Sequence, residues 1–568
     1  MNFVPRAAHF GKPLLPLVLA FVCSPLLPQI AAAQTPPQIG SPNTVVADPP
    51  VPRPATQPVT VPLFSHVAFA DFSAKPFSYT PPVSPTGRWA KIILVADYSV
   101  TAGRQFDRTA QISVGHTNIF FGTTAEPSSQ VSPAWHIERD VTDYASLLKT
   151  VQPGQADLGN IVNSTYIGVI YGTASLLFYP AVRHVPLPPV PDLVLPLPAG
   201  GNGVGSVGSP TDTLTGTYTL PTNITRAYLD LITQSQGGDE FWYFGVPDSL
   251  TGPLQSSGGT AFREAEITVD GTPAGVAPVF PWIYTGGIDP YLWRPIPGVQ
   301  TLNFAPYRVD LTPFAGLLSN GQPHTLGVRI FNNANYFQIA GALKLFRDPV
   351  LKTVTGALTE DTLAADPVPV VQTDLVTSAG GETTGPVSVT SSRQFRTAGY
   401  VQTYLGKVAT SIDQTVSFSS VQQFDVSASK DIQNSQQMTT VSSLTTTQNF
   451  YEVLTQQQTF QYPLTLRYSY LAQADGSASQ TTAIQQGDSV STAFFLNGLP
   501  TFTSNLTNTV SPSDTLLFDP SGAATRQGQH SAQTYSSSDS TGSLYRRTIT
   551  ADGGVLSSVT NSSKGGTK

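Results

Sequence analysis

Trp89-Ala-Lys-Ile-Ile-Leu-Val-Ala96 is a run of apolar and small residues that is typical of a buried β-strand. Similar runs follow at Gln111-Ile-Ser-Val114, Ile167-Gly-Val-Ile-Tyr171 and Ser175-Leu-Leu-Phe-Tyr179. Between these runs, Asp140-Val-Thr-Asp-Tyr-Ala-Ser-Leu-Leu148 is typical of a short helical or turn segment. We therefore predict that residues 63–185 form a first all-β domain.

A second unit, residues 211–348, repeats this pattern. Its strand-like runs are Gly216-Thr-Tyr-Thr-Leu220 and Arg226-Ala-Tyr-Leu-Asp-Leu-Ile-Thr233, and Glu266-Ile-Thr-Val-Asp-Gly271 ends in the Asp-Gly pair of a hairpin turn. Both units place an Asp-Val/Leu-Thr segment, beginning at Asp140 or Asp310, before a late strand. The repeat predicts two antiparallel β-sandwiches of related plan.

The remaining segments differ in composition from these two units. Residues 34–62 and 186–210 are rich in proline or glycine and are predicted to be linkers. Residues 349–568 are rich in Ser, Thr and Gln, and alternating stretches such as Gln414-Thr-Val-Ser-Phe-Ser419 predict a β-structured C-terminal region with half-exposed strands.

The N-terminus, residues 1–33, has the pattern of an export signal. Arg6 and Lys12 precede an apolar run from Leu14 to Leu27, and Ala31-Ala-Ala33 offers a cleavage site. We expect a secreted or periplasmic protein that has no membrane segment after cleavage. The only cysteine of the chain, Cys23, lies within this signal, so the mature chain is expected to have no disulfide, thiolate metal site or cysteine nucleophile.

Charge excludes one class of partner. Only 11% of the 568 residues are charged, the formal net charge is −7 and the isoelectric point is about 5.5. Without a basic stripe, a nucleic-acid partner has no electrostatic footprint in this sequence.

Two segments place carboxylates among aromatic residues in predicted strands: Gln105-Phe-Asp-Arg-Thr109 and Gly238-Asp-Glu-Phe-Trp-Tyr243. Burial of a carboxylate is costly unless it is paired or used. Asp107 and Glu240 can therefore be a working pair shared across a domain interface, or two unrelated structural residues. Asp239 is an alternative to Glu240 as the second carboxylate of this pair.

The order of several motifs resembles the peptide:N-glycanase A family over most of the mature chain. The first half of the resemblance comprises Phe106-Asp-Arg-Thr109, Thr124-Ala-Glu-Pro127, Trp135, Asp140-Val-Thr-Asp-Tyr144 and Phe178-Tyr-Pro180. The second half comprises Glu240-Phe-Trp-Tyr243, Phe262-Arg-Glu264, Tyr284-Thr-Gly-Gly-Ile288, Trp293-Arg-Pro295 and Asp310-Leu-Thr-Pro-Phe314. A more distant similarity is to the PNGase F type of bacterial glycanase, which is built from two jelly rolls.

This resemblance implies a fold and an activity. The fold is all-β, with two jelly-roll-like antiparallel sandwiches followed by the Ser/Thr-rich region. The activity is hydrolysis of the amide that joins N-acetylglucosamine to asparagine in N-glycosylated peptides and glycoproteins, without a cofactor. The bacterial-style signal and the expected absence of disulfides indicate a bacterial member of the kind that works at acidic pH. The catalytic residues that the resemblance implies are Asp107 and Glu240. A third acidic residue of PNGase F is expected near Asn163, where no carboxylate stands.

Five further residues are candidates for substrate binding, each with a structural alternative. Arg108 can hold a carboxylate or a sugar hydroxyl, but in a regular strand it would face away from Asp107. Glu126 contacts the substrate or caps its loop. Trp242, Trp293 and Arg294 are candidates for a sugar-stacking wall with a polar clamp, although core packing is equally compatible with both indoles. Trp135 and Trp282 are predicted to be core residues.

Other chemistries have weaker support. The six histidines of the mature chain are not paired at ligand spacing, so we expect no metal site. We expect a monomer. Two other functions remain open: a carbohydrate-binding sandwich protein without catalysis, and a glycoside hydrolase that uses two carboxylates.

Overall fold

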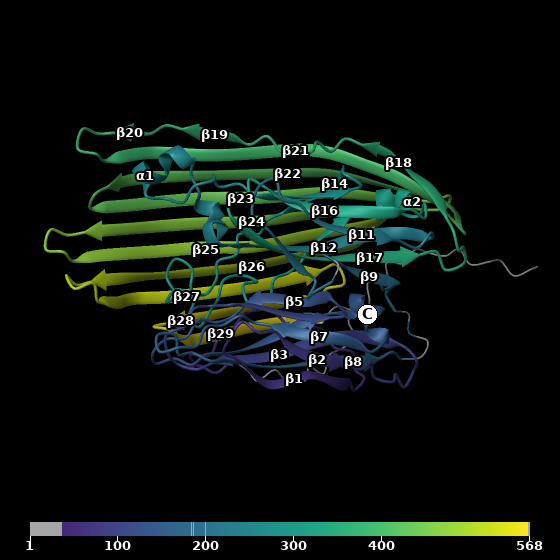
Figure 1. Ribbon diagram of the computed structural model, residues 1–568, viewed down its shortest axis with the longest axis horizontal. Coiled ribbons are helices and arrows are strands. Elements are labelled where there is room, and N and C mark those ends of the chain that lie inside the picture. Colours follow the sequence, from purple (N-terminus) through teal and green to yellow (C-terminus); the bar gives the residue numbers. More distant parts are fainter. Residues whose placement is uncertain (1–36, 183–184, 186, 199, 566–568) are drawn as a thin grey trace, which may run out of the picture.

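The computed structural model describes residues 37–182, 185, 187–198 and 200–565, and the predicted signal peptide with Cys23 lies outside them. The described chain consists mainly of antiparallel β-sheets, which confirms the predicted all-β fold (Figure 1). Two sandwiches pack beside one large C-terminal sheet, and the first sandwich lies next to the β28–β29 edge of that sheet.

The first sandwich contains two four-stranded sheets with the strand orders β1-β8-β3-β6 and β2-β7-β4-β5. Alternate side chains of β3, from Ile92 through Leu94 and Ala96 to Tyr98, are at most 4% exposed and belong to one core. The strands are β1 (Val59–Phe69), β2 (Lys75–Tyr79), β3 (Trp89–Val100), β4 (Thr109–Val114), β5 (Thr117–Thr123), β6 (Ala134–Asp140), β7 (Gln152–Asp157) and β8 (Ile170–Pro180).

The second sandwich has the same plan. Its sheets are β10-β17-β12-β15 and β11-β16-β13-β14, and β9 also pairs with β17. The strands are β9 (Leu193–Leu197), β10 (Val204–Val207), β11 (Leu214–Thr219), β12 (Ile224–Gln236), β13 (Glu264–Val269), β14 (Thr272–Pro278), β15 (Tyr307–Asp310), β16 (Pro323–Phe331) and β17 (Tyr336–Arg347). When the strands are numbered within each unit, with β10 as the first strand of the second unit, both sandwiches have the strand orders 1-8-3-6 and 2-7-4-5. The predicted relation between the two sandwiches is therefore confirmed.

Two local features predicted from sequence are present. In each repeated segment an aspartate accepts a bond from the following threonine N–H: Thr142 to Asp140 at 3.0 Å, and Thr312 to Asp310 at 2.9 Å. Short 3₁₀ turns η1 (Thr142–Tyr144) and η6 (Thr312–Phe314) begin there. Asp270 and Gly271 both have positive φ, +51° and +80°, as a type I′ hairpin turn between β13 and β14 requires.

The prediction that residues 186–210 form a linker is wrong. This segment contains β9 and β10, which pair with consecutive parts of β17 and together form the edge of a sheet of the second sandwich. Prolines are tolerated at such an edge because one side of the strand needs no ladder partner.

The predicted linker at residues 34–62 also needs correction. β1 begins at Val59, inside that range. Upstream, the Ala47 side chain is fully buried and its N–H donates to Gln533 Oε1 at 2.8 Å. Thr44 N–H donates to the Ala134 carbonyl. The described part of this segment is therefore a strap that connects the first sandwich to the C-terminal sheet.

The C-terminal region forms one antiparallel sheet of twelve strands. The central strands are long, and their alternating burial leaves one face against the second sandwich. The strands are β18 (Thr355–Asp361), β19 (Val370–Thr373), β20 (Val376–Thr377), β21 (Thr383–Thr403), β22 (Gly406–Ser427), β23 (Lys430–Gln448), β24 (Val453–Ala472), β25 (Ala478–Leu496), β26 (Leu499–Phe518), β27 (Ala524–Asp539), β28 (Leu544–Asp552) and β29 (Val555–Lys564).

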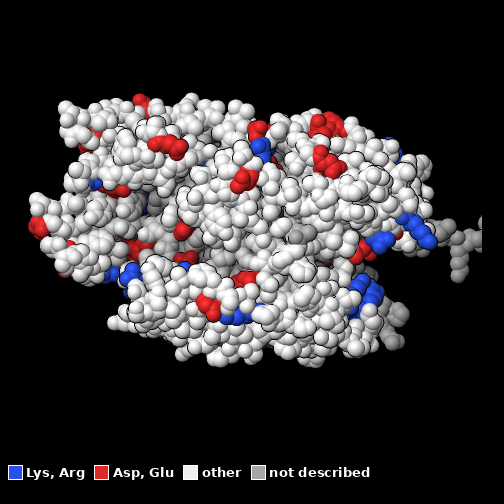
Figure 2. Space-filling view, viewed as in Figure 1, with Lys and Arg blue, Asp and Glu red and all other residues white. Residues whose placement is uncertain are grey.

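Charged side chains are sparse on the surface shown in Figure 2, as the composition predicts. In the part of the chain that the structure describes, helical structure is limited to short turns, among them η3 (Gly237–Asp239), η4 (Trp242–Phe244), α1 (Thr251–Leu254) and α2 (Ala315–Leu318). Within the described residues, no helix has the length and apolar character needed to cross a membrane.

Candidate active site

Asp107 lies in a loop just before β4, and not in the strand predicted from the sequence. The loop is fixed by neighbouring side chains. The buried Gln105 amide donates to the carbonyls of Ile161 and Gly168 at 2.8 and 3.0 Å. Arg108 N–H donates to Thr124 Oγ1 at 2.9 Å. These bonds hold the Asp107 carboxylate at the boundary between the two sandwiches.

From the second sandwich, Gly286 N–H donates to Asp107 Oδ1 at 3.0 Å. A Cβ at position 286 would lie 2.4 Å from Asp107 Oδ1 and also 2.4 Å from Glu126 Oε2. The two carboxylates therefore converge on one point, which only a glycine leaves free.

Glu126 lies in a loop, as predicted, and its side chain is 11% exposed. Its backbone N–H donates to Thr285 Oγ1 at 3.0 Å, and the Thr285 hydroxyl donates to the Thr124 carbonyl at 2.8 Å. The Arg294 guanidinium lies 3.7 Å from Glu126 Oε1 and donates to the Pro127 carbonyl at 2.6 Å. Residues 285–294 thus position an acid that belongs to the first sandwich.

Glu240 follows the η3 turn, which replaces the predicted strand. Asp239, the alternative candidate, is fully buried and has a structural role. Arg263 donates to it at 2.7 and 3.0 Å, and the N–H groups of Asn335 and Tyr336 donate to it at 2.6 and 3.1 Å. This network anchors the turn and leaves Glu240, which is partly exposed, as the carboxylate available for chemistry.

The three acids share one electrostatic environment. Burial raises the pKa of Asp107 to about 6, opposed by the Gly286 N–H and the Arg108 charge. Burial and the Asp107 charge raise the pKa values of Glu126 and Glu240 to about 7. Asp107 is thus the acid whose charge acts on the other two, and it ionises first. Its neighbours keep their protons to higher pH.

Arg108 has the structural role that was one of the two alternatives considered from the sequence, because its side chain holds the Asp107 loop. Its guanidinium donates to Gln105 Oε1 at 2.7 Å and to Asn160 Oδ1 at 3.3 Å. Since no regular strand passes through this segment, the predicted alternation of Arg108 and Asp107 across two faces does not apply.

The two tryptophans predicted to stack on sugar are buried. Trp242 is 1% and Trp293 is 2% exposed, and Trp293 Nε1 donates to the Gly287 carbonyl at 2.9 Å. Neither ring offers an open face, so core packing fits both better than the predicted stacking wall. Trp135 and Trp282 are also buried, as predicted.

An exposed aromatic surface lies beside Asp107. Phe106 is 47% exposed, and its ring lies 5.3 Å from the ring of Tyr166. Phe241, next to Glu240, is partly buried and lies close to Gly287. Tyr166, Thr285 and Gly286 were not predicted. The Tyr284-Thr-Gly-Gly-Ile288 motif contains two of them, but nothing local in it indicates a contact with residue 107.

The described residues contain no cluster of three or more His, Cys, Asp and Glu side chains arranged to hold a metal ion. The chemistry available to the three acids and their backbone donor is proton transfer. One ionised carboxylate beside protonated ones can activate water and protonate a leaving group.

Comparison with known proteins shows which family this chain resembles in sequence. The family model for "Peptide N-acetyl-beta-D-glucosaminyl asparaginase amidase A" matches residues 49–348. The peptide-N4-(N-acetyl-beta-glucosaminyl)asparagine amidase A of Prunus dulcis is 28% identical over 460 residues, which are 77% of this chain and 79% of the relative.

Two similar solved structures are PNGase F, a glycosylasparaginase from Flavobacterium meningosepticum, and PNGF-II. PNGase F has 17% identity and a TM-score of 0.35 over 51% of this chain and 96% of its own. PNGF-II has 14% identity and a TM-score of 0.35 over 51% of this chain and 65% of its own. The family match spans both sandwiches and includes all three acids, and on that ground the chain belongs to the peptide N-acetyl-β-D-glucosaminyl asparaginase amidase A family.

Proposed function

We propose that this protein hydrolyses the amide between N-acetylglucosamine and asparagine in N-glycosylated peptides and glycoproteins through a carboxylate pair, Asp107 and Glu240. Membership of the amidase family supports the reaction. One observation supports a joint role for Asp107 and Glu240: acids from both sandwiches converge, and the Gly286 N–H donates to Asp107.

The two acids divide the work according to their pKa values. Asp107, with the lower pKa, is the base that takes a proton from water as the water oxygen attacks the asparagine carbonyl carbon. Glu240, protonated up to about pH 7, gives its proton to the nitrogen as the carbon–nitrogen bond breaks. The products are an aspartate side chain and a glycosylamine.

Glu126 supports Asp107 in this scheme. Its proton is retained to about pH 7 because of burial and the charge of Asp107. A protonated Glu126 is a hydrogen-bond donor for the oxyanion of the tetrahedral intermediate, and the exposed Phe106–Tyr166 surface suits the C–H faces of a sugar.

Mass analysis of a denatured glycoprotein after incubation across acidic to neutral pH tests the function. Peptides in which aspartate replaces the glycosylated asparagine are expected. A residual N-acetylglucosamine on the peptide would indicate a glycoside hydrolase, and an unchanged glycopeptide a binding protein. Asp107→Asn should abolish turnover with an unchanged unfolding temperature; normal activity in that variant contradicts the assignment.

We also propose that the protein is exported and works as a monomer. The charged, apolar and small-residue regions of residues 1–33 support export. N-terminal sequencing of the protein from a culture medium or periplasm should begin at Gln34, and sedimentation should give the mass of a single chain.

A further inference from the structure

Three cavities with shared lining residues border the C-terminal sheet. Two lie between the sheet and the second sandwich, and the third also borders the strap at residues 46–50 and β6 of the first sandwich. The first, of about 290 Å³, shares Pro306, Tyr307 and Phe460 with a second of about 100 Å³. The second shares Gln300, Ala305 and Asp488 with a third of about 290 Å³. Together they form one groove, which we call the seam groove. None of the three acids of the candidate active site lines it.

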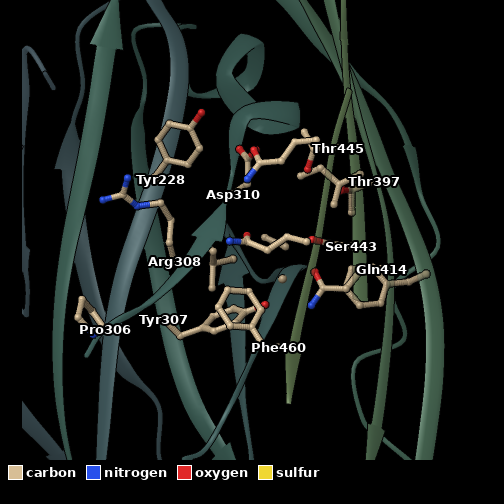
Figure 3. Close-up of a pocket in the computed structure, with 17 residues that line it drawn as sticks. Tyr228, Pro306, Tyr307, Arg308, Asp310, Thr397, Gln414, Ser443, Thr445 and Phe460 are labelled. Carbon is tan, nitrogen blue, oxygen red and sulfur yellow. The ribbon is translucent and has the colours of Figure 1, made fainter. Parts of the chain in front are cut away.

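One end of the first cavity is aromatic, with one ring from the second sandwich and one from the C-terminal sheet. Tyr307, from β15, and Phe460, from β24, have ring centroids 5.1 Å apart, and both side chains are partly exposed. Figure 3 shows them together at one end of the cavity. Such rings pack well against the C–H faces of a sugar. Pro306 and Arg308 also line the cavity and are exposed to solvent.

The sheet side of the cavity is neutral and mostly polar, and the register of the strands explains the position of its polar residues. Gln414 pairs with Ser443, and Ser443 pairs with Gln458, so these residues form a row across β22, β23 and β24. Thr445 and Gln456 pair in the next row on the same face, two residues along. The two rows offer amide and hydroxyl groups in a regular array.

One amide in this array is available for a ligand. Gln414 Nε2 is buried and has no partner at normal hydrogen-bond distance among the described residues, and the polar group with which the Gln414 side chain interacts is the Tyr307 hydroxyl of the same cavity. In Figure 3 the Gln414 side chain extends from the sheet toward the centre of the cavity, and Asp310 lies across from it. Asp310 Oδ1 accepts the Thr312 N–H at 2.9 Å, and the Thr312 side chain is a second partner of the same carboxyl group. A buried donor and a carboxylate acceptor thus face the same space.

The charged side chains of the first cavity disfavour an anionic ligand. Arg308 is the only cationic side chain among the described residues that line the first cavity, and Asp230 and Asp143 accept its bonds at 2.6 to 2.9 Å. A phosphate or carboxylate ligand would therefore lack a free cation. Each larger cavity is near the lower end of the roughly 300–1,000 Å³ range of small-ligand sites. In the first cavity, the aromatic faces, the neutral donors and the single carboxylate acceptor suit a polyhydroxylated, uncharged ligand.

We propose that the seam groove is a second saccharide-binding site, which holds the neutral sugar units of an oligosaccharide between Tyr307, Phe460 and the glutamine rows. The proposal takes only the class of sugar from the proposed function, because binding here requires no hydrolysis. It also gives the C-terminal sheet a direct role in recognition.

Binding of a free oligomannose oligosaccharide to the full chain carrying Asp107→Asn tests this, measured by titration calorimetry. Two sites per chain are expected. The double variant Gln414→Leu, Gln456→Leu keeps side-chain volume but removes two hydrogen-bonding groups, and should weaken groove binding about tenfold or more. Gln457→Leu is the matched control, since Gln457 is exposed and points to the opposite face of β24.

Each result decides a separate question. Loss of one site in the double variant, with both sites kept in Gln457→Leu, supports the groove. A single site in the Asp107→Asn chain, or equal binding by both variants at unchanged unfolding temperatures, overturns it. If the unsubstituted protein releases no aspartate-containing peptide while groove binding persists, the amidase mechanism fails and the saccharide site stands.

Discussion

Gly286 is the residue at which the acids of the first sandwich meet the loop of the second. Gly286→Ala would place a Cβ 2.4 Å from an oxygen of each of Asp107 and Glu126, and both carboxylates would have to move. Since misplacement of a catalytic group by about 1 Å can cost roughly 100-fold in rate, kcat/KM should fall by about that factor. Steady-state kinetics on a glycopeptide measures the loss.

Gly252→Ala is the control for this substitution, because a Cβ at that exposed position would meet nothing within 4 Å. It should keep full activity. Full activity in Gly286→Ala as well would show that the close approach of the two carboxylates does not matter for the reaction.

The pKa values of the acids predict a bell-shaped pH dependence of kcat/KM. Asp107 must be ionised to act as a base, so activity should fall as pH drops below about 6. Glu240 must be protonated to act as an acid, so activity should fall as pH rises above about 7. Glu240→Gln should lose the alkaline limb and lower the maximum by about 100-fold or more.

A rate profile from pH 4 to 9 checks this, with Glu126→Gln as the parallel variant because the pKa of Glu126 is also raised to about 7. An alkaline limb that persists in Glu240→Gln and disappears in Glu126→Gln would assign proton donation to Glu126.

At the scale of residues, the sequence predicts which acidic residues belong to the candidate site but not the groups that surround them. Asp107, Glu126 and Glu240 follow from motif order, whereas 179 residues separate Asp107 from the Gly286 N–H that fixes it. The strands predicted around Asp107 and Glu240 are a loop and a 3₁₀ turn, because buried bonds to Gln105 and Asp239 outweigh the local apolar pattern.

At the scale of elements, the C-terminal sheet holds the loop that carries Gly286. Gln486, from β25, accepts the Val299 N–H at 2.8 Å and donates to the Pro281 carbonyl at 2.6 Å, and so binds both ends of the loop. Gln529, from β27, donates to the Arg294 carbonyl at 3.1 Å. Both glutamines are at most 5% exposed. The loop is therefore positioned by strands distant in sequence.

A carboxyl pair connects the same loop to β26. Burial and the Asp289 charge raise the pKa of Asp514 to about 7, and burial raises the pKa of Asp289, while Arg294 and Arg526 partly oppose these increases. A carboxyl group whose pKa is higher in the folded than in the unfolded protein favours folding while it is protonated. Its contribution to the free energy of unfolding is therefore greatest at low pH and is lost as pH rises toward about 7. Asp514→Asn should remove most of this loss, which is on the order of 2 kcal/mol between pH 5 and pH 7 because both carboxyl groups are buried.

Thermal unfolding at pH 5 and pH 8 measures this effect. The unsubstituted protein should unfold at a lower temperature at pH 8 than at pH 5, and Asp514→Asn should narrow the difference. Asp519→Asn, at an exposed turn after β26, is the control. An equal pH dependence in all three proteins would mean that Asp289 and Asp514 do not share a proton.

Sequence patterns predict elements well where the signal is local. The Asp-Gly hairpin and the two aspartate-capped turns need only neighbouring residues, and all three are present. The segment 186–210 fails as a linker because its prolines are compatible with an edge strand, and only pairing with β17 reveals the strand.

At the scale of the whole molecule, the second sandwich and the C-terminal sheet share one hydrophobic core, whereas the first sandwich has its own. Phe262 of the sandwich lies 5.1 Å from Phe418 of β22, and Phe280 lies 4.9 Å from Tyr462 of β24, measured between ring centroids. The boundary predicted at residue 348 is thus a change in composition and not a boundary between independent cores.

A chain that ends at residue 348 should therefore fail to fold completely. Its second sandwich would expose the aromatic surface that Phe418 and Tyr462 cover, and the Pro281–Val299 loop would lose Gln486 and Gln529. Exposed apolar patches of this kind promote aggregation. We expect hydrophobic-dye binding, loss of amidase activity, and one remaining cooperative transition from the first sandwich. A soluble, active truncated protein with the unfolding profile of the full chain would show that the shared core is dispensable.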